Sequence, residues 1–167
     1  MAIRILTRRA ALTALGAIML APGAAVAQPP IRFRAVEVDV GPLRASVGDP
    51  TAAWVAESLT PALAQALAPY LAPGDRNRAT LVARIGNLYL GPSGGGPNAF
   101  GRGQDTIEGD LVVRGPRGGV VSDVPLRAIT SYYPNGVNQP LWAQWNRSRV
   151  DALAQAFAGW VPRQLGL

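Results

Sequence analysis

Aromatic and amide side chains gather in one short stretch of the sequence and form its most distinctive candidate for a binding site. Tyr132, Tyr133, Trp142 and Trp145 lie within 14 positions, around a polar turn that contains Asn135. Stacking rings beside amide groups suit a sugar, a lipid headgroup, an aromatic ligand or a protein partner. The two tryptophans also fall on the apolar stripe of a predicted helix, where tryptophan usually belongs to a core or a subunit interface. The sequence leaves both interpretations open.

Two carboxylates suggest a second kind of chemistry. Glu108 and Asp110 alternate along a predicted strand, which places their side chains roughly 6.5–7 Å apart on one face. Glycoside hydrolysis requires two carboxylates about 5–9.5 Å apart, so a carboxylate-dependent hydrolase of polysaccharide is one hypothesis. A solvated sheet face explains the same pattern, and we assign Asp105 to that face as well. The three acids are the nearest approach to a calcium site, but they lie on a strand rather than in a binding loop, and we expect no metal ion.

The residue types that are missing exclude several activities. The sequence contains no histidine and no cysteine, and all of its 16 basic residues are arginine. Nucleophilic triads of the usual kind need an imidazole or a thiolate, and most zinc sites use the same side chains. A P-loop needs a lysine after its glycines, so the glycine-rich segment 91–103 is predicted to be a loop between strands. We expect no cofactor.

The first 27 residues have the three zones of an export signal. Arg4, Arg8 and Arg9 form a positive start, residues 10–21 are almost entirely apolar, and Ala25-Val26-Ala27 offers small residues for a signal peptidase. The apolar stretch is shorter than the roughly 20 residues that span a bilayer. The pattern therefore predicts a cleavable signal with cleavage after Ala27, rather than a membrane anchor that stays uncut.

The same segment indicates the export pathway and the cellular compartment of the protein. Thr7-Arg8-Arg9-Ala10-Ala11-Leu12 resembles a twin-arginine signal, which exports proteins already folded, and general secretion is the open alternative. Because the chain has no cysteine, an N-terminal lipid anchor is excluded. We therefore expect a periplasmic or secreted protein without a transmembrane segment in its mature form.

Residues 28–167 are predicted to form a single mature domain. Three of the 16 arginines lie in the signal, which leaves 13 basic against 10 acidic residues, scattered along the chain without a run or stripe. Nucleic-acid binding requires a clustered basic face, so we expect no nucleic-acid partner. Exposed sheet edges would allow an oligomer.

Periodicity predicts the elements of this domain. Alternating apolar residues predict strands at 31–40, with a bulge near Arg34-Ala35, and at 105–114. A stretch rich in branched apolar residues predicts a well-buried strand at 79–90, and a further strand is expected at about 120–133. Residues 41–48 are assigned to a connection. A helix begins at Asp49-Pro50, is kinked or split at Pro61, and ends at Pro73-Gly74. The turn chemistry of 115–119 joins two of the strands in a hairpin.

A last helix is predicted from Asn138 onward. Its buried face is assigned to Leu141, Trp142, Trp145, Leu153, Ala156, Phe157 and Trp160, and its polar side to Arg147, Arg149 and Asp151. The element order β-α-β-β-β-α predicts an α+β fold, a two-layer sandwich in which a mainly antiparallel sheet of about four strands carries two helices on one face.

The export signal, the domain size and this element order resemble small bacterial envelope accessory proteins. Examples are the lipopolysaccharide-assembly lipoproteins and the auxiliary lipoproteins of lipid-moving ABC transporters, which carry the lipidated cysteine that this chain lacks. The resemblance covers nearly the whole mature chain as an order of elements, and it implies no functional residue. The sequence therefore favours a non-enzymatic periplasmic binding or envelope accessory protein, with an envelope protein, lipid or glycan as its partner. The alternative is the hydrolase of envelope polysaccharide that uses Glu108 and Asp110.

Overall fold

The computed structural model describes residues 31–91, 103–132 and 142–167. The predicted signal segment, the glycine-rich segment from residue 92 to 102 and the predicted cap of the last helix lie outside these ranges. The described residues form four strands and three α-helices in the order β1 (Phe33–Asp39), α1 (Gly41–Val47), α2 (Asp49–Ala66), β2 (Ala79–Leu90), β3 (Gly103–Arg114), β4 (Val120–Tyr132) and α3 (Trp142–Gln164), with a short 3-10 helix, η1 (Ala68–Tyr70), after α2.

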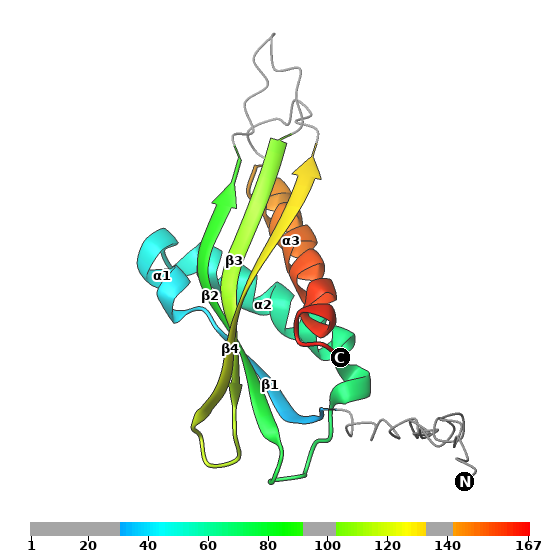
Figure 1. The fold of residues 1–167 in the computed structure, drawn as a ribbon. Helices are drawn as coiled ribbons and strands as arrows, with labels where there is room; N and C mark the ends of the chain where they lie inside the picture. Colours follow the sequence, from blue (N-terminus) through cyan, green and yellow to red (C-terminus); the bar gives the residue numbers. More distant parts are fainter. Residues whose placement is uncertain (1–30, 92–102, 133–141) are drawn as a thin grey trace, which may run out of the picture.

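The strands form one sheet in the order β1-β2-β3-β4, and α2 and α3 pack on each other and against the sheet (Figure 1). The α+β sandwich is thus confirmed in outline, with two corrections. The described residues contain three α-helices rather than two. The sheet is mixed, because β1 pairs with β2 in parallel while the β2–β3 and β3–β4 pairs are antiparallel. The chain returns through α1 and α2 before β2, and such a helical crossover brings the second strand back in the direction of the first.

Sequence periodicity located most of the strands. Strand β2 has the predicted bounds, the register of β1 shifts between Phe33 and Ala35 where the bulge was expected, and Gly115 and Gly119 close the predicted hairpin with an N–H···O bond of 2.8 Å. The inward residues of β2 and β3 lie in one core with α2 and α3. The large side chains that are fully buried there include Leu59, Leu63, Leu81, Ile85, Ile107, Leu111, Leu153 and Phe157.

The region before α2 differs from the prediction. Residues assigned to a connection form α1, which buries Leu43 in the core. Helix α2 includes Asp49, whose carboxylate makes no capping hydrogen bond and instead pairs with Arg44 at 2.5 Å. Pro61 does not split the helix, which runs on to Ala66 before η1.

Helix α3 buries a different stripe from the predicted one. Leu153 and Phe157 are buried as expected, but Trp160 is 50% exposed. The buried stripe is Val150, Leu153, Ala154, Phe157, Ala158 and Val161, which follows the three- and four-residue spacing of one helix face. The predicted polar side is also divided, because Arg147 pairs with Glu57 of α2 at 2.5 Å and Asp151 accepts a hydrogen bond from Ser58, whereas Arg149 is buried.

Strand β4 is an edge of the sheet, and its middle is protected against further strand pairing. Pro125 has no N–H to donate, and its carbonyl accepts a hydrogen bond of 3.1 Å from Gln164 Nε2 of α3. An unpaired edge is a template for association, so this contact blunts the edge where a long strand would be most exposed. Within the described residues, none of the helices combines the length and the apolar character that a membrane crossing requires.

Candidate functional site

A buried ion pair lies at the end of the sandwich where β2 ends and β3 and α3 begin. Asp105 projects from β3 on the same side as Ile107, and its carboxylate is 1% exposed, while the Arg149 side chain on α3 is 5% exposed. Arg149 Nε donates to Asp105 Oδ2 at 2.8 Å, and Nη2 donates to Oδ1. This fork-to-fork geometry is the strongest form of an arginine–carboxylate contact.

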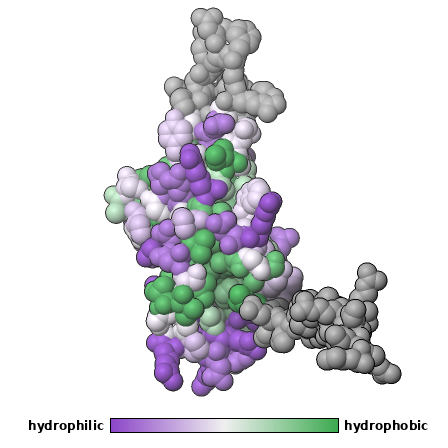
Figure 2. Space-filling model, viewed as in Figure 1, coloured by the Kyte–Doolittle hydropathy of each residue, from purple (hydrophilic) through white to green (hydrophobic). Residues whose placement is uncertain are grey.

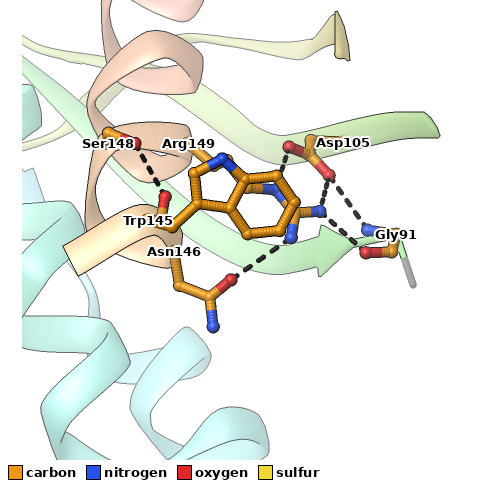
Figure 3. Close-up of polar contacts among 6 residues, drawn as sticks. All are labelled: Gly91, Asp105, Trp145, Asn146, Ser148 and Arg149. Carbon is orange, nitrogen blue, oxygen red and sulfur yellow. Dashed lines mark hydrogen bonds and ion pairs between the residues drawn. The ribbon is translucent and has the colours of Figure 1, made fainter. Parts of the chain in front are cut away.

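Backbone groups complete the hydrogen bonding of the pair (Figure 3). Gly91, which follows β2, donates its N–H to Asp105 Oδ1 at 2.9 Å and accepts from Arg149 Nη2 at 2.7 Å. Arg149 Nη1 donates to the side-chain oxygen of Asn146 at 3.2 Å. Among the described residues, no buried side-chain nitrogen or oxygen is left without a partner. The ion pair therefore joins β2, β3 and α3 without the cost of unpaired buried charge.

Trp145 lies directly over this pair. The Arg149 guanidinium carbon is 4.7 Å from the centroid of the indole, within the range of a cation–π contact. Ser148 Oγ donates to the Trp145 carbonyl at 2.7 Å, and the indole itself is partly exposed. The indole is thus held on a guanidinium plane that is itself fixed by Asp105 (Figure 3).

The predicted aromatic site is located in part. Trp145 lies at this end and is neither fully buried nor free of the fold. Tyr132 is the last residue of β4 and pairs with Gly103 at the start of β3, and Trp142 is the first residue of α3, one turn before Trp145. The side chains of Tyr132 and Trp142, and the whole of Tyr133 and Asn135, lie outside the described residues.

The sequence predicts exposed positions for the two residues that organise this site, Asp105 and Arg149, but both are buried. Asp105 was placed on the solvated face with Glu108 and Asp110, but it is in phase with the buried Ile107 and not with those acids. Arg149 was placed on the polar side of the last helix, although it lies four residues after Trp145 and four before the buried Leu153. In both cases the position of the residue along its strand or helix indicates burial, whereas the charge of its side chain suggests exposure.

The carboxylate pair lies on the opposite face of the sheet. Glu108 Oε1 is 3.1 Å from Arg127 Nε, and Asp110 Oδ2 is 3.1 Å from Arg84 Nη2. The hydrogen bond that Arg84 donates to Asp110 raises the pKa of Arg84 above its ordinary value. Both acids line an open depression of about 400 Å³ together with Asn87. Because each carboxylate is held by an arginine, the face has the character of a solvated ion-pair network. Among the described residues, no group of three or more acidic side chains is arranged to bind a metal ion.

Comparison with known proteins gives structural likenesses only. No protein-family model matches the sequence, and no curated protein matches it. The fold is similar to a minor lipoprotein from Acinetobacter baumannii (TM-score 0.45, 12% identity, covering 78% of this chain and 94% of that one). It is also similar to a candidate lipoprotein from Caulobacter crescentus CB15 (TM-score 0.49, 16% identity, covering 80% and 85%).

Proposed function

We propose that the chain is an exported, non-enzymatic envelope protein that binds a partner through the end of the sandwich around Trp145. The observation that carries the proposal is the indole of Trp145, partly exposed and stacked on an arginine that a buried carboxylate holds in place. Tryptophan is one of the side chains that are enriched at the energetic centre of an interface. An indole that is already fixed loses little conformational entropy when a partner binds.

The ion pair supports a positioning role more than a purely stabilising one. Apolar residues of similar volume often stabilise a protein as well as a buried ion pair does, or better. An arginine on α3 that binds both Asp105 and Gly91 nevertheless fixes the helix relative to two strands in one geometry. That geometry sets where Trp145 stands. A hydrolase that uses Glu108 and Asp110 is not favoured, because both groups are bound to arginines on an open face.

Replacing Trp145 with alanine is expected to weaken partner binding by about 2 kcal/mol, or roughly 30-fold. Tagged protein would be captured from the envelope fraction of its own cells, and the bound proteins, lipids and glycans would be quantified. Trp160→Ala is the matched control, because Trp160 lies on the same helix, is 50% exposed and also faces an arginine, Arg163, at 5.3 Å. Equal recovery of every component by the Trp145→Ala protein, with an intact fold, would contradict the proposed site.

Export is expected to remove the first 27 residues. The mass of the protein isolated from its own cells should correspond to a chain that begins at Gln28, and the protein should fractionate with periplasmic markers. Replacing Ala25 and Ala27 with leucine removes the small residues that the peptidase requires, so that variant should keep its full length. A wild-type protein that still begins at Met1 and accompanies cytosolic markers would overturn the assignment to the envelope.

A further inference from the structure

The topology gathers arginines at the end of the sheet opposite Trp145. Because β1 and β2 are parallel and β3 is antiparallel to β2, β1 and β2 begin where β3 ends and β4 begins. The segments 31–33, 74–79 and 113–121 meet there. They contain five arginines and one acid: Arg32, Arg76, Arg78, Arg114, Arg117 and Asp75. Charges that are scattered along the sequence thus become a basic cluster in the fold.

Most of this positive charge is not neutralised by the protein. Asp75 Oδ2 pairs with Arg78 Nε at 2.9 Å, and this hydrogen bond lowers the pKa of Asp75. Within the described part of the chain, Arg32 and Arg117 have no acidic partner. Asp75 therefore neutralises one of the five arginines, and the described residues leave this end of the molecule with a net positive charge.

An apolar groove lies between these arginines. It has a volume of about 490 Å³, and Ile31, Phe33, Val113 and Val121 line it together with Arg32 and Arg78. A second depression of about 440 Å³ adjoins it, shares Val121, and is lined by Val120 and Arg117. Figure 2 shows hydrophobic side chains gathered over the lower part of the molecule, with hydrophilic side chains at the tip below them.

The β3–β4 hairpin places aliphatic side chains in solvent at this end. Val121 is 72% exposed, Val120 is 63% exposed and Ile31 is 52% exposed. Scattered exposed apolar residues need no explanation, but these three lie beside an apolar groove and near Arg32 and Arg117, which have no acidic partner among the described residues. The combination of protruding aliphatic groups and a positive rim matches the interfacial region of a membrane, where acyl chains lie below anionic phosphates.

We propose that this end, defined by Ile31, Arg32, Arg117, Val120 and Val121, docks on the surface of an anionic lipid bilayer. The valines would enter the boundary between headgroups and acyl chains, and the guanidinium groups would bind lipid phosphates. The sequence contains no cysteine that could carry a lipid, and a basic and aliphatic surface would supply a reversible attachment to the membrane. The Trp145 end then points away from the bilayer.

The test uses the mature protein isolated after export, without the predicted signal, and vesicles of phosphatidylcholine alone or with one third phosphatidylglycerol. Co-sedimentation is expected with the anionic vesicles at about 50 mM salt and not with the neutral ones. Since the Debye length falls from roughly 10 Å at 0.1 M to about 3 Å at 1 M salt, binding should be lost at high salt. Absence of binding to the anionic vesicles, or equal binding to both kinds, would overturn the proposal.

Substitutions then localise the contact. The Arg32→Gln/Arg117→Gln variant should bind about 30-fold more weakly, from roughly fivefold for each arginine near an anionic surface. Arg44→Gln/Arg127→Gln removes the same charge from positions elsewhere and should bind like the wild type. An equal loss in both variants would show an effect of net charge only and would contradict a defined docking end.

The contribution of the aliphatic side chains to binding distinguishes an anionic bilayer from a polyanion that has no apolar interior. Val120→Thr/Val121→Thr keeps the charge and the strand preference and should bind roughly tenfold more weakly. The control is Ile129→Thr, which changes a 48% exposed residue in the half of β4 that leads to the Trp145 end. No loss in the double valine variant would point to a purely electrostatic site and would overturn membrane docking. Trp145→Ala should bind vesicles normally, so failure of one proposal leaves the other to be judged separately.

Discussion

Replacing Arg149 with methionine is expected to lower the free energy of unfolding by about 3–5 kcal/mol. The substitution leaves the Asp105 carboxylate, 1% exposed, without the guanidinium that binds both of its oxygens. It also removes the hydrogen bond to the Gly91 carbonyl. Such a loss is a large part of the roughly 5–15 kcal/mol that stabilises a typical domain. Urea unfolding of the wild type and the variant, followed by circular dichroism, measures it.

Two further variants show whether the loss comes from a buried charge. Arg127→Met breaks an exposed ion pair with Glu108 and should cost less than about 1 kcal/mol. Asp105→Leu/Arg149→Met removes both charges and should recover much of the stability lost by Arg149→Met alone, because no unpaired charge stays buried. If Arg149→Met and Arg127→Met proved equally mild, the pair at the Trp145 end would not have the role assigned to it.

Gly109→Ala is expected to destabilise the protein by about 1–3 kcal/mol. A Cβ atom at Gly109 would lie 2.5 Å from the carbonyl oxygen of Arg84 and 2.9 Å from Cδ1 of Ile85. Because the nearer neighbour is backbone in the paired strand β2, the clash can be relieved only by moving the strands apart. The measurement is the midpoint of thermal unfolding, which should fall by several degrees.

Gly86→Ala is the matched control for this substitution. Gly86 lies at the register shift of β2, close to Gly109 in the sheet, and a Cβ atom there would meet no atom within 4 Å. Its effect should stay within about 0.5 kcal/mol. Equal stability of the two alanine variants would mean that β2 and β3 do not approach as closely at Gly109 as described.

Much of the fold was contained in local patterns of the sequence. The branched apolar residues of 79–90 indicated β2, the glycines around Pro116 indicated the hairpin, and the spacing of Val55, Leu59 and Leu63 indicated the buried face of α2. These patterns are local because the residues that recur with the period of a helix or strand lie on one face of that same element.

Other features depend on contacts that no local pattern contains. Helix α1 has seven residues and one buried side chain, Leu43, which is too few for a periodic signal. The parallel pairing of β1 with β2 depends on where two helices return the chain. In α3 the buried stripe is set by contact with α2 and β4, and this contact leaves Trp160 in solvent although its size favoured burial.

In the candidate site, the charge of two side chains conceals that they occupy inward-facing positions. Asp105 and Arg149 are ionisable, and ionisable residues are almost never fully buried unless they are paired. Each occupies an inward position, and each is the partner that makes the other's burial acceptable. A sequence pattern finds such a pair only when two inward charges of opposite sign on different elements are considered together.

The two proposed surfaces give the molecule an orientation. The arginine cluster and the exposed valines lie where β1 and β2 begin, whereas Trp145 lies where β2 ends. A partner bound at Trp145 would therefore be held at a distance from the membrane set by the length of the sheet. Separate loss of vesicle binding and of partner binding in the two sets of variants is the expected signature of this arrangement.

The most direct test asks whether the buried pair positions the indole for binding. The affinity for the captured partner would be measured for Trp145→Ala, for Asp105→Leu/Arg149→Met after circular dichroism has verified its fold, and for all three substitutions together. We expect both sets to weaken binding, and the combination to be little weaker than Trp145→Ala alone, because they act on one contact. Wild-type affinity in Asp105→Leu/Arg149→Met would contradict the account.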